Sequence, residues 1–342
     1  MMQKESFGKE ALYSHPTDKG VQCGICPHEC NLSDGQRGLC RSRVNHGRTL
    51  YSEAYAHPCA LHVDPVEKKP LLHYYPGCRC LSVASTGCNF ACLNCQNWEI
   101  SQALPSEVRN IDLPPAKLVD ECMASQCPAI AYTYTEPITF YEYMYDSALL
   151  AHEAGIRNIL VSAGYINDEP LRRLCTVLDA ANIDLKSFSD AIYQKISHGH
   201  LQPVLNTLKV MKEAGVWLEV TNLLIPSVND DPQMIRDMCQ WLVSNGFADT
   251  PLHFSRFFPM YRMNNVPMTP IETLVSARES ALAAGMHFVY IGNVSEQEGE
   301  NTVCPSCGKL LVRRNGYDLL ENHLADGKCP DCGTTIAGRW KD

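Results

Sequence analysis

Strand and helix patterns alternate along the chain from about Leu81 to Asn293, and this alternation restricts the fold more than any other feature. Helical patterns separate a series of short apolar runs that predict strands: LSVAST, AIAYTYT, NILVSAG, NIDLKS, WLEVTNLLI, LHFSRF and HFVYIGN. Repeated strand–helix units imply parallel strands joined by right-handed crossovers. About six units in roughly 210 residues fall short of the eight units and about 250 residues of a complete barrel. We therefore expect an α/β fold, a partial (β/α)6 barrel of the TIM type, with a doubly wound sheet as the alternative.

Capping patterns predict where two of the helices begin. Thr139 with Glu142, and Thr269 with Glu272, each have the spacing of a capping box. Gly155 is placed to end the first of these helices.

The chain of 342 residues contains 18 cysteines, and most of them fall into three spaced groups. The groups are Cys23, Cys26, Cys30 and Cys40; Cys88, Cys92 and Cys95; and Cys304, Cys307, Cys329 and Cys332. The polar N-terminus lacks the apolar segment of a signal peptide, and no apolar run reaches transmembrane length. We therefore expect a cytoplasmic protein without membrane contact, whose grouped cysteines bind metal rather than form disulfides.

The two outer groups predict domains on either side of the barrel. The expected division is a cysteine-rich N-terminal extension (1–80), the barrel (81–298) and a zinc-ribbon or rubredoxin-like domain (299–342). The two CPxCG turns of the last domain favour zinc, because each offers two thiolates on one tight loop. For the first group, a structural zinc ion and an auxiliary iron–sulfur cluster that relays electrons both stay open. Cys59, Cys78 and Cys80 are expected to be packed thiols.

The central group has C-x3-C-x2-C spacing directly after the first predicted strand. Three thiolates at these spacings can bind three corners of a [4Fe–4S] cluster, which usually takes four cysteines. One iron then keeps an open position for a substrate or cofactor. The alternatives are a zinc site and a cluster that only transfers electrons.

This loop, together with the alternating strand–helix pattern of a partial barrel around it, resembles the radical S-adenosylmethionine (SAM) superfamily. The resemblance implies that SAM binds the open iron and is cleaved reductively to a 5′-deoxyadenosyl radical, which abstracts hydrogen from a substrate. It thus implies a radical SAM oxidoreductase, with Cys88, Cys92 and Cys95 as its catalytic cluster ligands. The cofactor carries that chemistry, and the protein orients it.

The resemblance also implies that residues at strand ends contact SAM. They are Glu136, Ser162, Gly164, Asp184, Lys186, Asn222, Tyr290 and Gly292. The family often has Gly-Gly-Glu-Pro before the second helix, whereas this chain has Tyr134 and Thr135 in place of the glycines. The segment from Ile225 resembles an activase Pro-Gly turn with Ser227 replacing glycine. His253 and Arg256 flank the sixth strand and are further candidates to face the substrate.

The runs CPHEC and DPVEKKPL narrow the resemblance to the AmmeMemoRadiSam system radical SAM enzyme, a relative of pyruvate formate-lyase-activating enzyme. This implies a one-electron donor such as flavodoxin or ferredoxin, and Memo-like, AMMECR-type or glycyl-radical proteins as partners. A small molecule, peptide or RNA is the alternative substrate, and the net charge of −9 argues against nucleic acid. The rival class is a non-catalytic metal-binding adaptor or an electron-transfer iron–sulfur protein. An adaptor does not need Glu136, Asp184 and Lys186 beside Cys88.

Overall fold

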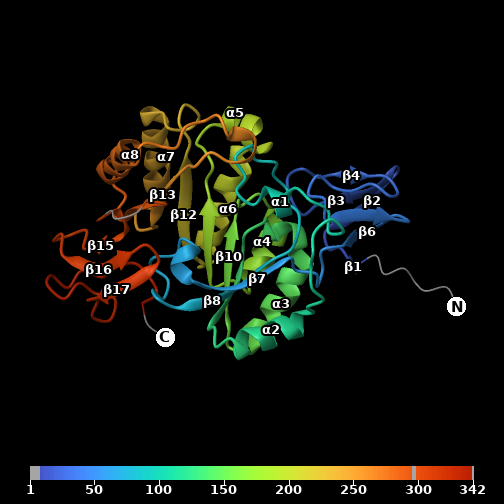
Figure 1. Ribbon diagram of the computed structural model, residues 1–342, viewed down its shortest axis with the longest axis horizontal. Helices are drawn as coiled ribbons and strands as arrows, with labels where there is room; N and C mark the ends of the chain where they lie inside the picture. Colours follow the sequence, from blue (N-terminus) through green and yellow to red (C-terminus); the bar gives the residue numbers. More distant parts are fainter. Residues whose placement is uncertain (1–7, 295–297, 341–342) are drawn as a thin grey trace.

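The computed structural model describes residues 8–294 and 298–340, and its largest element is a sheet of eight strands (Figure 1). Its parallel strands lie side by side in chain order: β8 (Arg79–Ala84), β9 (Ala129–Tyr132), β10 (Arg157–Ser162), β11 (Ala180–Asp184), β12 (Trp217–Leu224), β13 (Leu252–Arg256) and β14 (Val289–Gly292). The strand β7 (Ala60–Pro65) pairs antiparallel with β8 at one edge, which the strand–helix pattern did not predict.

This strand order excludes the doubly wound alternative. A doubly wound sheet reverses its strand order at a switch point, whereas here the order never reverses. Among the described residues no ladder joins β7 to β14, so the sheet is open. The prediction of an α/β fold with a central, mostly parallel sheet is confirmed, and the sheet is consistent with a partial barrel.

One long helix lies in each crossover between neighbouring parallel strands: α2 (Pro115–Ala124), α3 (Tyr141–Glu153), α4 (Asp168–Cys175), α6 (Leu201–Glu213), α7 (Pro232–Ser244) and α8 (Ile271–Ala283). Right-handed crossovers in a constant strand order place these helices on one side of the sheet. Short helical turns complete the loops: η1 (Val66–Lys68), α1 (Trp98–Ser101), η2 (Pro137–Phe140), α5 (Asp190–Ile192), η3 (Tyr193–Ser197), η4 (Tyr261–Met263) and η5 (Glu298–Glu300). Every residue of β9 is buried, as expected for a parallel strand covered on both faces.

Both predicted capping boxes are wrong. Thr139 lies inside η2, where its hydroxyl donates to the Glu136 carbonyl, and Glu142 instead forms a buried ion pair with Arg43. The Thr269 hydroxyl donates to a strand carbonyl and does not cap α8. In both cases long-range partners compete for the polar side chain that would have capped the helix. Gly155 does follow α3 with a φ of 73°, as its predicted role requires.

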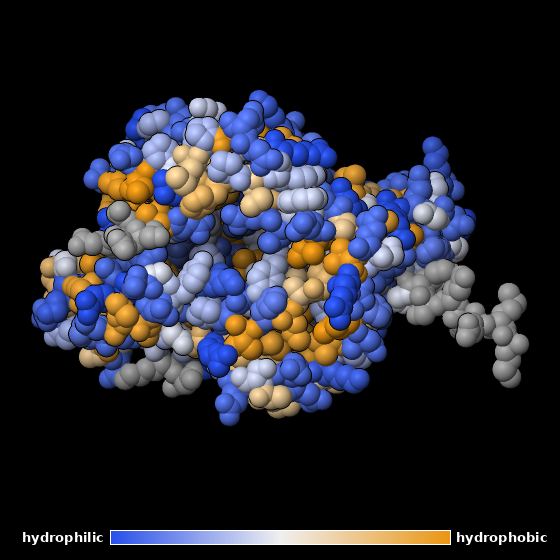
Figure 2. Space-filling model, in the orientation of Figure 1, coloured by the Kyte–Doolittle hydropathy of each residue, from blue (hydrophilic) through white to orange (hydrophobic). Residues whose placement is uncertain are grey.

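The N-terminal region forms two small antiparallel sheets: β1 (Lys9–Glu10), β6 (Thr49–Ser52) and β5 (Arg43–His46); and β2 (Ser14–Thr17), β3 (Gly20–Cys23) and β4 (Asn31–Leu32). Figure 2 shows a mainly hydrophilic outer surface over these sheets, because apolar residues such as Val21 and Leu50 are turned inward. The Arg43–Glu142 pair, with N–O distances of 2.7 Å, joins this region to α3.

The C-terminal region lies on the other side of the barrel (Figure 1) and contains β15 (Thr302–Val303), β16 (Leu310–Asn315) and β17 (Asp318–Asn322). Its apolar residues Leu311 and Ile336 pack with Leu72 and Phe288 of the barrel side. The buried Arg314 guanidinium donates to the Leu72 carbonyl at 2.6 Å. The region therefore has a hydrophobic interface with the barrel.

Candidate active site

A cavity of about 570 Å³ opens at the carboxyl ends of the parallel strands, where barrel enzymes hold their active sites. Most of the predicted site residues line it: Cys88, Cys92, Cys95, Glu136, Ser162, Asp184, Lys186, Tyr290 and Gly292. These residues come from the last positions of parallel strands and from the loops that follow them, so the fold gathers positions that are far apart in the chain.

The cysteine loop follows β8 through Gly87, which has a φ of 101°. A Cβ atom at Gly87 would lie 2.4 Å from the Cys40 carbonyl oxygen, so this close approach requires glycine. Burial raises the pKa of Cys88 and of Cys92; Glu136 raises that of Cys88 further, and the Lys186 ammonium partly opposes the rise at Cys92.

The central thiols fit the cluster that the sequence predicts. Cys88, Cys92 and Cys95 are free thiols on one cavity. In the described part of the chain their sulfur atoms do not all lie within 4.8 Å of one another. A single tetrahedral ion needs its sulfurs closer together than this, whereas thiolates that each bind a separate iron of a cluster do not.

Glu136 joins the ends of β9 and β10 at the cavity. Its carboxylate accepts from the Ser162 hydroxyl at 2.7 Å and from the backbone amide of Ala163 at 2.8 Å. Burial raises its pKa, while these hydrogen bonds favour the charged form. The carboxylate therefore positions the backbone beside Cys88 as well as lining the cavity.

Two of the three residues that replace glycines have a backbone conformation that glycine favours, and Thr135 does not. Tyr134 has a φ of 65°, and Ser227 has a φ of 60°. Tyr134 is held there because its hydroxyl donates to Asp64, and the Lys69 ammonium lies 4.5 Å from its ring centre. Lys69 in turn lies 2.7 Å from a carboxylate oxygen of Asp64. Tyr134 and Ser227 therefore occupy a left-handed conformation that glycine would adopt without strain.

Asp184 and Lys186 form an ion pair of 2.5 Å at the cavity wall. Burial opposes the charge on Lys186, but Asp184 and Cys92 outweigh it and hold the Lys186 pKa above its usual value. A lysine ammonium has three N–H donors, so donors remain for an anionic group in the cavity.

Two predicted cofactor contacts lie outside the cavity lining. The Asn222 side chain is buried and donates to the Leu185 carbonyl at 2.6 Å. Gly164 has a φ of 68°, and a Cβ there would lie 2.9 Å from the Ile183 side chain. Both residues support the loops that carry lining residues, and nothing in their placement supports direct contact with SAM.

Several lining residues were not among the predicted SAM contacts. Lys69 lies in the DPVEKKPL run, so a motif signal for it existed. His253 lines the cavity and binds the buried Glu219 carboxylate at 2.7 Å, whereas the other candidate, Arg256, donates to Thr269 outside it. Tyr317 comes from the tip of the β16–β17 hairpin, and no sequence pattern indicated that this domain reaches the cavity.

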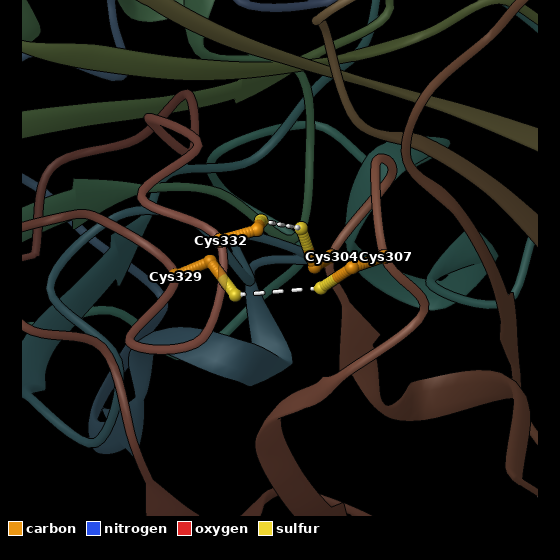
Figure 3. Close-up of side chains that lie close together, drawn as sticks. All are labelled: Cys304, Cys307, Cys329 and Cys332. Carbon is orange, nitrogen blue, oxygen red and sulfur yellow. Dashed lines mark hydrogen bonds between the residues drawn. The ribbon is translucent and has the colours of Figure 1, made fainter.

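The C-terminal cysteines form a compact group of four sulfur atoms, all within 4.8 Å of one another (Figure 3). The sulfurs of Cys304 and Cys332 are 3.5 Å apart, and those of Cys307 and Cys329 are 3.7 Å apart. Around one zinc ion with Zn–S bonds of about 2.3 Å, tetrahedral sulfurs stand roughly 3.8 Å apart. Hydrogen bonds from Thr334 lower the pKa of Cys332 to about 6, which favours the thiolate. The group therefore has the geometry of a single-ion site.

Comparison with known proteins identifies the class and then the family. Residues 82–241 match the model of the radical SAM superfamily. An uncharacterized protein of Methanocaldococcus jannaschii is 44% identical over 331 residues, which are 96% of this chain and 98% of that protein. The chain belongs to the same family as this archaeal protein.

Solved structures show weaker likeness. A domain of pyruvate-formate lyase-activating enzyme from Bacteroides vulgatus is 18% identical, with a TM-score of 0.42 over 48% of this chain and 98% of that one. Streptococcus suis SuiB bound to S-adenosylmethionine is 10% identical, with a TM-score of 0.49 over 67% of this chain and 53% of that one. In the described residues no helix is both long and apolar enough to cross a bilayer.

Proposed function

We propose that this chain is a radical SAM enzyme that holds a [4Fe–4S] cluster on Cys88, Cys92 and Cys95 and cleaves SAM reductively beside it. The observation that carries the proposal is the shared cavity: Glu136, Asp184 and Lys186 line it together with the three cysteines. A metal-binding adaptor has no need to gather these side chains at one point. The match of residues 82–241 to the radical SAM superfamily supports the same conclusion.

The bound cluster supplies a low-potential electron and an open iron position for the methionine part of SAM. The Lys186 ammonium is placed to pair with a carboxylate in the cavity, and Asp184 keeps it charged. Asp184 can also accept from ribose hydroxyls. Tyr290 and Gly292 offer a wall for the adenine ring at the end of β14.

We further propose that the substrate is a glycyl-radical-type protein, which the enzyme activates by hydrogen abstraction. Its electron would come from a flavodoxin or ferredoxin in the cytoplasm, and Memo-like and AMMECR-type proteins would be its partners. The support is the resemblance of the CPHEC and DPVEKKPL runs. A glycyl-radical EPR doublet on a co-encoded protein would support this role, and its absence under SAM cleavage would exclude it.

At the C-terminus we propose a zinc ion on Cys304, Cys307, Cys329 and Cys332. The sulfur spacing of 3.5 and 3.7 Å supports one tetrahedral ion rather than an iron–sulfur cluster.

The test of the main proposal is release of 5′-deoxyadenosine. Protein reconstituted with iron and sulfide without air, then given dithionite and SAM, should form it in amounts that rise with protein concentration. Cys92→Ser should lose the product together with the absorbance of the central cluster. Cys122→Ser is the matched control, because Cys122 is buried in α2 away from the cavity and serine can keep its bond to the Cys127 carbonyl. A filled cluster that releases no product, with or without candidate substrates, would overturn the proposal.

A further inference from the structure

The N-terminal cysteines surround one small cavity beside the active-site loop. Cys23, Cys26, Cys30 and Cys40 all line it, and only Cys30 is more than slightly exposed. In the described residues no three of these sulfur atoms lie within 4.8 Å of one another, in contrast to the compact C-terminal group. We propose that this group holds a second [4Fe–4S] cluster, and that it passes electrons to the cluster at Cys88.

The positions of the N-terminal sulfurs favour a cluster over a zinc ion. A zinc ion needs all four sulfurs on one small tetrahedron, as found at the C-terminus. A [4Fe–4S] cluster binds each thiolate through a different iron at a corner of the cube, so the sulfurs stand farther apart. In the described residues neither the N-terminal group nor the central cysteines bring three sulfur atoms within 4.8 Å of one another.

The groups around the cavity suit an anionic cluster. Backbone amides of Ile25, His28 and Leu39 donate to Cys23, Cys26 and Cys30 respectively. Hydrogen bonds to cluster sulfurs are one of the means by which proteins set cluster potential.

One buried donor near the thiols lacks a partner. Arg43 lines the same cavity, and its buried Nε–H has no hydrogen-bond partner among the described residues. A cluster with four thiolate ligands is negatively charged and would accept this donor. Ser42 also donates to Cys40 at 3.5 Å.

The cavity adjoins the active-site cysteine loop directly. Asn89, the residue after Cys88, lines the N-terminal cavity, and its carbonyl accepts from the His28 ring at 2.7 Å. Gly87, the residue before Cys88, makes its close approach to the Cys40 carbonyl. The two cysteine groups therefore lie on backbone segments that contact each other.

The far side of the N-terminal cavity faces solvent. Leu39 lines the cavity and is 62% exposed, so the group lies close to the protein surface.

This inference rests on the proposed function. One electron leaves a reduced flavodoxin or ferredoxin, enters at the N-terminal group and reaches the Cys88 cluster. No bond or proton is exchanged at the relay.

The first experiment tests the site without using activity. A Cys88→Ala/Cys92→Ala/Cys95→Ala variant, reconstituted without air, should retain about four irons and four sulfides of the about eight each in the wild type. It should also give an S = 1/2 EPR signal after reduction. Iron without sulfide, zinc in place of iron, or no metal at the N-terminal group would overturn the proposal. Failure of SAM cleavage in the wild type would leave this result intact and would count only against the proposed function.

The second experiment tests the relay with Cys26→Ser/Cys30→Ser, using Cys59→Ser as the control. The double variant should keep the central cluster and its SAM cleavage with excess dithionite, yet lose most of its cleavage with reduced flavodoxin. Equal SAM cleavage with reduced flavodoxin in the double variant and the control would overturn the relay. It would also be overturned if the double variant, with its central cluster fully loaded, lost the same share of SAM cleavage with dithionite as with flavodoxin.

Discussion

The N-terminal and C-terminal cysteine groups lie on opposite sides of the barrel (Figure 1) and differ in how far apart they hold their sulfur atoms. The C-terminal thiols come from two tight turns and meet at one point. The N-terminal thiols come from a longer loop and stand around a cavity. Because both groups have four cysteines, the distance between thiolates rather than their number separates the single-ion site from the proposed cluster site, since one ion and a cube of four irons need different spacings.

The two regions also attach to the barrel differently. In the N-terminal region Nη2 of Arg43 pairs with both oxygens of the Glu142 carboxylate, and this pair helps to raise the Arg43 pKa against the opposing effect of burial. Arg314 in the C-terminal region donates to the Leu72 carbonyl and the Thr302 hydroxyl, and burial lowers its pKa. The N-terminal interface therefore contains a buried arginine paired with a carboxylate. At the C-terminal interface the buried arginine instead donates to a carbonyl oxygen and a hydroxyl oxygen.

The largest expected effect is loss of the C-terminal metal. Cys329→Ser should remove one zinc and unfold the domain, because a segment this short has little core and structural zinc contributes on the order of 10 kcal/mol at neutral pH. Hydrogen exchange of 302–322 should approach that of a free chain, while the cluster absorbance stays. Cys59→Ser is the control, and unchanged exchange in the metal-free variant would contradict a structural role.

A smaller effect is expected at the N-terminal attachment. Glu142→Gln leaves the Arg43 charge buried without its counter-ion, so the free energy of unfolding should fall by about 3–5 kcal/mol. Urea denaturation followed by fluorescence measures it. The double variant Arg43→Met/Glu142→Met removes both charges and should regain most of the loss. If the double variant has the same free energy of unfolding as the single variant, side-chain packing rather than charge pairing stabilises this contact.

Arg314→Met should cost less than Glu142→Gln. It removes a buried charge together with its hydrogen bonds and leaves the Leu72 carbonyl without this donor, a loss of about 1–3 kcal/mol. Urea denaturation gives the value, and Arg314→Lys, which keeps one charged donor, should fall between the wild type and Arg314→Met. A loss as large as that of Glu142→Gln would erase the distinction between the two interfaces.

The smallest effect is expected at the surface pair of Arg37 and Glu53, whose side chains are 34% and 24% exposed. Arg37→Ala should lower the free energy of unfolding by less than about 1 kcal/mol, because water already solvates both charges. The same urea experiment serves, repeated at high salt, where the difference should shrink. A larger loss would mean that the N-terminal sheets depend on this pair.

Local patterns were enough to predict the parallel strands and the position of the cysteine loop, because apolar periodicity reflects burial directly. They failed for the helix caps at Thr139 and Thr269, since distant partners took the polar groups. They also failed for β7, whose strand pairs with β8 only through tertiary contact. No local pattern predicted that Asn222 donates to the Leu185 carbonyl, and its contact with SAM stays a prediction.

The amino-acid sequence by itself determined the chemistry available to this protein: which thiols exist, their spacing along the chain, and the strand ends on which Glu136, Asp184 and Lys186 stand. Tertiary structure alone decided which of these groups meet in one cavity, that Tyr317 of the last domain reaches the same cavity, and how far apart each set of sulfurs stands. The physical reason is that ligand geometry depends on distances through space, and those distances are set by packing between segments far apart in the chain.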